Sequence, residues 1–124
     1  MHERYGFEAF SYGRCVYDML EEYCTSYTVE SWQGYLLSNG GFYNSLRSRE
    51  RTLRVVNRET EFDEDLSPDT LSIIFDLYAF KFLSESVSAE NIREQFRRDH
   101  HSLFEHMTRC DDEAVIRRFF KERR

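Results

Sequence analysis

The chain has 124 residues, of which 40% are hydrophobic and 16% aromatic, and its formal net charge is −6. A chain of this length buries enough surface to form one domain without staples, so we expect a single domain over residues 1–124. An acidic chain repels the phosphate backbone, which argues against direct binding to nucleic acid.

The first 30 residues give two conflicting signals. A spacing of three and four residues predicts a helix over 10–27, through Phe10, Gly13, Tyr17, Leu20, Cys24 and Tyr27. Residues 15–20 and 27–29 are nevertheless rich in the aromatic and branched side chains that favour strands. Periodicity alone does not choose between a helix and two short strands.

The patterns in residues 31–66 predict short helices and a short strand. Apolar faces at 32–36 and 42–46 indicate two short helices, separated by Ser-Asn-Gly-Gly at 38–41, where glycine ends a helix cheaply. Residues 52–56 predict a short strand, and the acidic stretch 59–66 predicts a loop.

The second half predicts helices. Ser67 is a good N-cap and Pro68 suits the first helical position, so an almost wholly apolar helix should occupy 68–83 at the centre of the core. A second helix should follow the N-cap candidate Ser88, with a fresh start at Ser102. Acidic residues 111–113 should open a last helix whose core-facing side chains are Val115, Ile116, Phe119 and Phe120.

Candidate chemical sites are few. Four metal-ligand side chains crowd one region, with two of them at helical i, i+4 spacing, but their spacing matches no familiar zinc module: His100, His101, His106 and Cys110. An arginine stripe would track phosphates only if 46–58 were a helix, and it consists of Arg47, Arg51, Arg54 and Arg58. We expect neither a metal nor another cofactor, and we interpret the stripe as a solvated face.

Catalysis is not expected either. The chain has no GxSxG, P-loop, GxGxxG or HExxH motif, and its carboxylate cluster at 63–65 lies in a stretch that should be exposed. Asp76 and Lys81 interrupt the central helix and are interpreted as edge or paired residues. The prediction is a protein that binds other proteins and is not an enzyme.

Three cysteines without a CxxC pair, a charged first segment and the lack of ~20 consecutive apolar residues predict a nuclear or cytoplasmic protein with no membrane contact. Four aromatic residues near the N-terminus should dock on something, either their own core or a second copy: Tyr5, Phe7, Phe10 and Tyr12.

WQGYLLSNGGFYNSL at 32–46 and YDML at 17–20 resemble two motifs of the BTB/POZ domain family, namely its helix–break–helix signature and its "CDVTL" strand. DLSPDTLSIIFDLY at 65–78 and SAENI at 88–92 take the places of its later helices. Trp32 stands where the family usually has His, and the segment at 47–52 lacks the hydrophobic residue of the cullin-recruiting motif.

The resemblance implies a mostly helical α+β fold, with a small sheet capped by helices in the first half and a helical second half. It implies a homodimer that assembles a regulatory complex, as a transcription or chromatin scaffold or a ubiquitin-ligase adaptor, although the altered motif speaks against cullin recruitment. The implied dimer interface is Tyr5, Phe7, Phe10, Tyr12, Trp32 and Tyr35. The alternative is an all-α protein of five to six helices, a small acidic regulator or inhibitor of one protein target.

Overall fold

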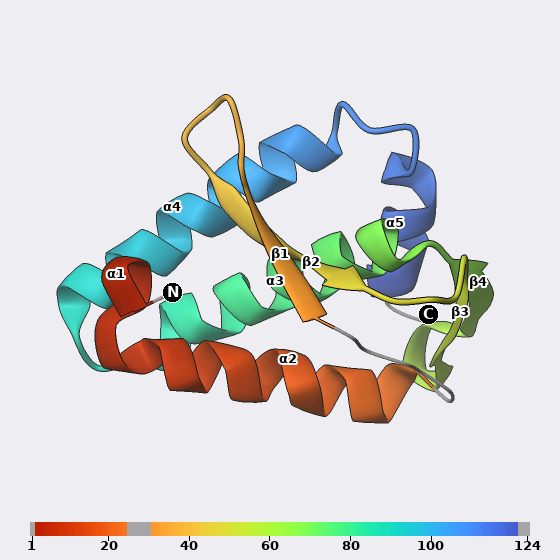
Figure 1. Cartoon of the computed structure of the whole chain (residues 1–124), viewed down its shortest axis with the longest axis horizontal. Coiled ribbons are helices and arrows are strands. Elements are labelled where there is room, and N and C mark those ends of the chain that lie inside the picture. The colour runs from red at the N-terminus through yellow and green to blue at the C-terminus, as the bar shows by residue number, and fades with distance from the viewer. Residues whose placement is uncertain (1, 25–30, 122–124) are drawn as a thin grey trace.

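The structure is a computed structural model that describes residues 2–24 and 31–121. Its elements run in the order α1, η1, α2, β1, β2, β3, η2, β4, α3, α4 and α5. Helix α3 packs against both α2 and α4, and two separate antiparallel hairpins complete the fold (Figure 1). The mostly helical α+β class is therefore confirmed, and the all-α alternative is wrong.

The N-terminal segment is helical. It comprises α1 (His2–Tyr5), the 3-10 turn η1 (Gly6–Glu8) and α2 (Ala9–Tyr23). The helical interpretation is therefore right as far as residue 23, and the strand at 15–20 is wrong; the alternative strand at 27–29 lies outside the described residues. The buried face overlaps the predicted one at Leu20 and Cys24 but otherwise consists of Tyr12, Val16 and Met19.

The predicted helices at 31–46 are wrong, because this segment forms a hairpin of β1 (Ser31–Leu36) and β2 (Phe42–Arg47). The break was placed correctly, but it turns the chain back instead of ending a helix. Gly40 has φ 89°, and a Cβ on Gly41 would lie 2.5 Å from Cβ of Ser102 in α4, so both glycines are required there.

The second hairpin joins β3 (Leu53–Asn57) and β4 (Phe62–Leu66) through η2 (Arg58–Thr60). The strand predicted at 52–56 is confirmed. The acidic loop at 59–66 is wrong, because Phe62 and Leu66 are buried while Asp63 and Asp65 point outward. The acidic side chains lie on the solvent-exposed face of a strand. Because they are so many, the alternation of buried apolar and exposed acidic residues was not recognised in the sequence.

Helix α3 (Pro68–Ser86) confirms the predicted central helix and runs one turn further than expected. The Ser67 hydroxyl accepts a hydrogen bond from the backbone N–H of Thr70, as an N-cap should. The β2 edge away from β1 is satisfied by α3: the N–H of Leu46 donates to the Ser72 hydroxyl, and that of Asn44 donates to Asp76. Polar residues inside α3 thus replace a third strand.

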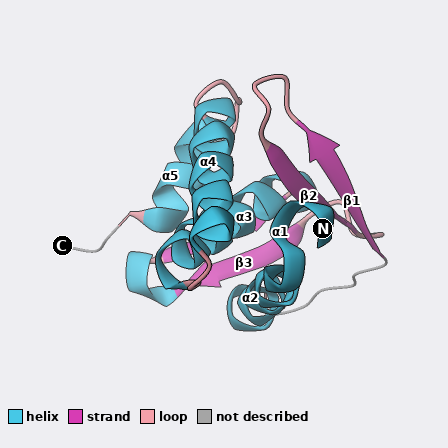
Figure 2. Ribbon diagram, turned by 90° about the vertical axis from the view of Figure 1, so that its left-hand side faces the viewer, coloured by secondary structure: helices cyan, strands magenta, loops and turns pink. Residues whose placement is uncertain are grey.

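Helix α4 (Glu90–Met107) runs without a break, so the fresh start predicted at Ser102 is wrong. The last helix is α5 (Glu113–Phe120), which buries Ile116 and Phe119 but leaves Phe120 partly exposed, contrary to expectation. Figure 2 shows the β1–β2 hairpin and α5 on opposite sides of α4. Within the described segments, no helix combines the length and apolarity needed to cross a membrane.

Candidate functional site

The six residues predicted as a dimer interface do not form one surface. Tyr5 and Tyr12 are buried in the chain's own core, where they pack with Phe80 and Phe96. The remaining four are exposed on separate elements, Phe7 in η1, Phe10 in α2, and Trp32 and Tyr35 in β1. Tyr5 and Tyr12 are thus buried within their own chain, and their burial involves no second copy.

The arginine stripe is broken. Its four residues lie on β2, the following turn, β3 and η2, so the helix that would align them does not exist. Arg54 makes two hydrogen bonds to the Asp63 carboxylate, at 2.9 and 2.6 Å from Nε and Nη2. That pair neutralises one charge of the predicted stripe.

The His/Cys region has structural contacts. The His106 ring stacks on Tyr43, and the Cys110 thiol donates to the His106 carbonyl at 3.4 Å. In the segments that the structure describes, no group of three or more His, Cys, Asp or Glu could hold a metal ion.

Two buried carboxylates fasten the N-terminal helices to the rest of the core. Asp99 accepts hydrogen bonds from the Tyr5 hydroxyl at 2.5 Å and from Arg4 Nε at 2.7 Å. Asp76 accepts from the Tyr12 hydroxyl at 2.5 Å, and burial raises its pKa to about 7. A raised pKa is also a mark of catalytic acids, but Asp76 is buried and its two carboxylate oxygens bind Tyr12 and the Asn44 amide, so its contacts indicate a structural role.

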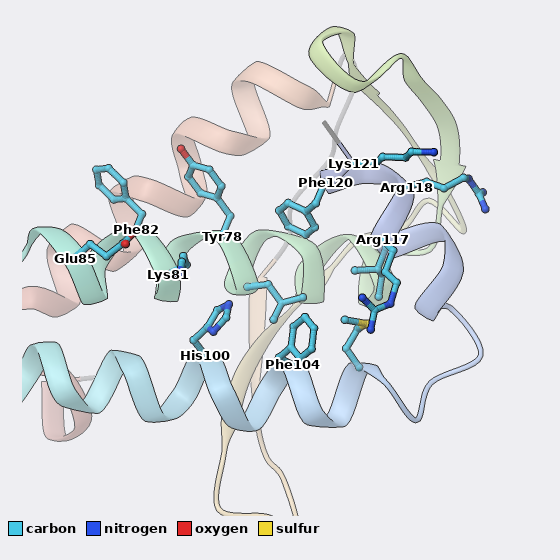
Figure 3. A pocket seen from close by; sticks show the side chains of 13 residues that line it. Tyr78, Lys81, Phe82, Glu85, His100, Phe104, Arg117, Arg118, Phe120 and Lys121 are labelled. Atoms are coloured by element: carbon cyan, nitrogen blue, oxygen red, sulfur yellow. The ribbon is translucent and has the colours of Figure 1, made fainter. Parts of the chain in front are cut away.

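An apolar cleft of about 630 Å³ lies between α3, α4 and α5 (Figure 3). Its apolar lining comes from all three helices: Leu77, Tyr78, Phe82, Phe104, Met107, Ile116 and Phe120. Tyr78, Phe82, Phe104 and Phe120 are between 37% and 50% exposed. Four aromatic rings at one hollow are more than scattered surface apolar residues, and such concentrations mark binding sites.

Local sequence explains why this face stays open. Tyr78 and Phe82 lie one turn apart on α3 and stack with ring centroids 6.2 Å apart. Lys81 and Glu85 share that exposed side of the helix, where their charges are solvated. A second hollow of about 540 Å³, between α2 and α3, also borders Tyr78 and Phe82. These two rings therefore form a ridge between two recesses.

The cleft margin is mainly basic. Lys81, Arg117, Arg118 and Lys121 line it, against the single carboxylate of Glu85. The Arg117 guanidinium lies 5.4 Å above the Phe104 ring and pairs with Glu113, while Arg118 pairs with Glu64. Burial, followed by the neighbouring Lys81 charge, lowers the pKa of His100 and keeps its ring neutral at pH 7.

The cleft was not predicted from the sequence, because the central helix was assigned to the core apart from Asp76 and Lys81 as edge or paired residues. An available signal was the position of Lys81 and Glu85 at i, i+4 beside Tyr78 and Phe82 in an otherwise apolar helix. A fully buried helix would not carry two unpaired charges on one side.

The fold and the cleft together define a small α+β protein with an exposed apolar cleft. The model of the antirestriction protein family matches residues 25–120, and the chain belongs to that family. It also resembles a solved chain from the structures of the KlcA and ArdB proteins, with a TM-score of 0.81 and 23% identity over 97% of this chain and 84% of the other. Those proteins show a novel fold and antirestriction activity against type I DNA restriction systems in vivo but not in vitro. No curated protein matches the sequence.

These findings overturn the BTB/POZ resemblance. The segment similar to its "CDVTL" strand lies in α2, and the segment similar to its two helices is the β1–β2 hairpin. The regulatory scaffold and the ubiquitin-ligase adaptor that it implied are wrong with it, and the implied homodimer and nuclear location lose their support. Short apolar motifs around glycines occur in many folds, so their presence here did not identify the family.

Proposed function

We propose that this chain inhibits type I DNA restriction inside a bacterial cell, and that it does so by binding a protein, without catalysis of its own. Family membership over residues 25–120 carries the proposal, and the shared fold supports it. The alternative interpretation of the sequence, a small acidic inhibitor of a protein target, agrees with this proposal, although that protein was expected to be all-helical.

The surface charges favour docking on a protein over imitation of DNA. A DNA mimic needs closely spaced negative charges, since duplex DNA carries one per ~1.7 Å of its axis. Here exposed carboxylates alternate with arginines in ion pairs such as Arg54–Asp63, Arg117–Glu113 and Arg118–Glu64. Such pairs cancel the field that a DNA-binding channel would recognise.

The conditions under which the similar proteins act support the same mechanism. KlcA and ArdB have antirestriction activity in vivo but not in vitro. An inhibitor that needs a further protein of the cell would behave in this way, because purified components would lack that protein. We place the activity in the bacterial cytoplasm, where incoming DNA meets the restriction enzyme.

A plating experiment tests the proposal. Phage carrying unmodified DNA is plated on a host with a type I restriction system, with and without expression of the chain, and phage with modified DNA serves as the control. Expression should raise the plating efficiency of the unmodified phage towards that of the modified phage. An unchanged efficiency with folded, abundant protein would refute the proposal.

A further inference from the structure

We propose that the α3–α4–α5 cleft binds an acidic helical segment of a partner protein through a stripe of apolar side chains on that segment. The inference rests on the proposed function and names the chemistry of the partner. It follows from three features of the cleft, namely its apolar floor, its basic margin and its length along α3.

The floor suits apolar side chains. Leu77, Met107 and Ile116 are buried at its base, and partly exposed aromatic rings form its walls. Seating an apolar side chain there removes surface of both partners from water, which is the main driving force for association. Aromatic side chains are also enriched among the residues that dominate binding energies at interfaces.

The basic margin of the cleft favours a negatively charged partner. The chain contains only two lysines, Lys81 and Lys121, and both line this cleft. Both are exposed, and within 2–24 and 31–121 neither makes an ion pair. Their charges are therefore available to a partner, whereas Arg117 and Arg118 already have carboxylate partners. Complementary charges around an apolar centre give an interface its specificity.

The length favours a segment of chain over a small molecule. The cleft follows α3 from Leu77 to Glu85, a rise of about 12 Å at 1.5 Å per residue, which matches about two turns of a docked helix. The Tyr78–Phe82 ridge then continues the apolar surface into the second hollow. Binding of an amphipathic helix in a groove uses apolar anchors at this spacing.

The net charge of −6 does not prevent such binding. The Debye length is about 8 Å at physiological ionic strength, so distant carboxylates of the chain are largely screened from a segment held in the cleft. Lys81 and Lys121 act at contact distance, where screening is weaker. Low salt should consequently slow the approach of an acidic partner without abolishing its binding.

The binding test uses the full chain and three fluorescent synthetic peptides. The first is a helical peptide with a leucine stripe and glutamates on its other faces. The second replaces each glutamate with lysine, and the third keeps the glutamates but replaces each leucine with serine. Fluorescence anisotropy gives the affinity of each peptide. The proposal predicts that the first binds best and that the lysine peptide and the serine peptide both bind weakly.

Two charge variants with equal changes in net charge locate the site. Lys81→Glu/Lys121→Glu should weaken binding of the acidic peptide by about tenfold or more, because like charges then face each other across the interface. Arg47→Glu/Arg51→Glu, which changes two exposed residues outside the cleft, should leave the affinity nearly unchanged. Phe82→Ser should weaken binding, and Phe7→Ser at a more exposed ring should not.

Three outcomes would overturn the inference. They are no binding of the acidic peptide, equal binding of the lysine peptide, and equal effects of the two charge variants. Tight binding of dodecanoate without binding of the peptide would assign the cleft to small amphipathic anions instead. A dimer in sedimentation that Phe82→Ser dissociates would assign it to a second copy.

The plating assay separates this inference from the proposed function. If the wild-type chain relieves restriction and Lys81→Glu/Lys121→Glu does not, both stand. If both proteins relieve restriction equally, the function stands and the cleft inference fails. If the acidic peptide binds at the cleft but the wild-type chain gives no relief, the proposed function fails and the cleft chemistry stands.

Discussion

Replacement of Asp99 by Ala should destabilise the protein more than any exposed charge substitution. The Asp99 side chain is 2% exposed and accepts hydrogen bonds from Arg4 Nε at 2.7 Å, the Tyr5 hydroxyl at 2.5 Å and Gln95 Nε2 at 3.1 Å. The substitution leaves a fully buried tyrosine hydroxyl and a partly buried guanidinium without their acceptor.

Loss of one partner from a buried charged pair costs about 3–5 kcal/mol, and we expect the lower end because Arg4 keeps some access to water. For a chain of this size, 3 kcal/mol lowers the melting temperature by roughly 10–15 °C. Urea unfolding and thermal melts followed by circular dichroism measure both quantities. Asp18→Ala is the matched control, because its i, i+4 pair with Arg14 is exposed and contributes about 0.5 kcal/mol or less. Equal losses in the two variants would refute the assignment of Asp99 as the anchor of α1.

Three further predictions concern stability. Burial raises the pKa of Asp76 to about 7 from its usual 3.8, so the folded state holds a proton that the unfolded state releases. Stability should therefore fall as the pH rises from about 4 to 7, and Asp76→Asn, which imitates the neutral acid, should flatten that part of the profile; equally steep profiles would contradict the raised pKa. Gly41→Ala should cost about 1–3 kcal/mol in urea unfolding, because its new Cβ meets Ser102 at 2.5 Å. Gly13→Ala, in open space within α2, should stabilise the protein by about 0.5–1 kcal/mol, and a loss there would show that helix propensity is not what limits α2.

The central helix could be predicted from sequence because its signals are local. Ser67 and Pro68 set its start, and a long apolar run keeps it helical in any packing arrangement. Helix α5 is similar, since acidic residues open it and Ile116 and Phe119 fall on one face. In both helices the capping residues and the helical spacing of apolar side chains predict the same element that burial shows.

The hairpins could not be predicted in the same way, because distant partners decide them. β2 pairs with β1, and its Leu46 and Asn44 amides donate to Ser72 and Asp76 in α3. The sequence of 42–47 does not identify those partners. In β4, outward-facing Asp63 and Asp65 give a composition typical of a loop. β1 is exposed along its whole length and carries no burial pattern of its own.

The cleft was missed for a related reason. A helix that is apolar all round is usually buried, and that rule predicted Tyr78 and Phe82 inside the core. Exposure of those rings depends on where α2, α4 and α5 stop covering α3, which is a property of packing. Lys81 and Glu85, at i, i+4 in this apolar helix, were the sequence features that indicated an exposed side.

The most direct test of the account is the plating efficiency of unmodified phage on a host with a type I restriction system. Three strains are compared, expressing the wild-type chain, Lys81→Glu/Lys121→Glu and Arg47→Glu/Arg51→Glu at equal levels of folded protein. We expect relief of restriction by the wild type and by the Arg47/Arg51 variant, and loss of relief in the Lys81/Lys121 variant. No relief by the wild-type chain would contradict its central claim.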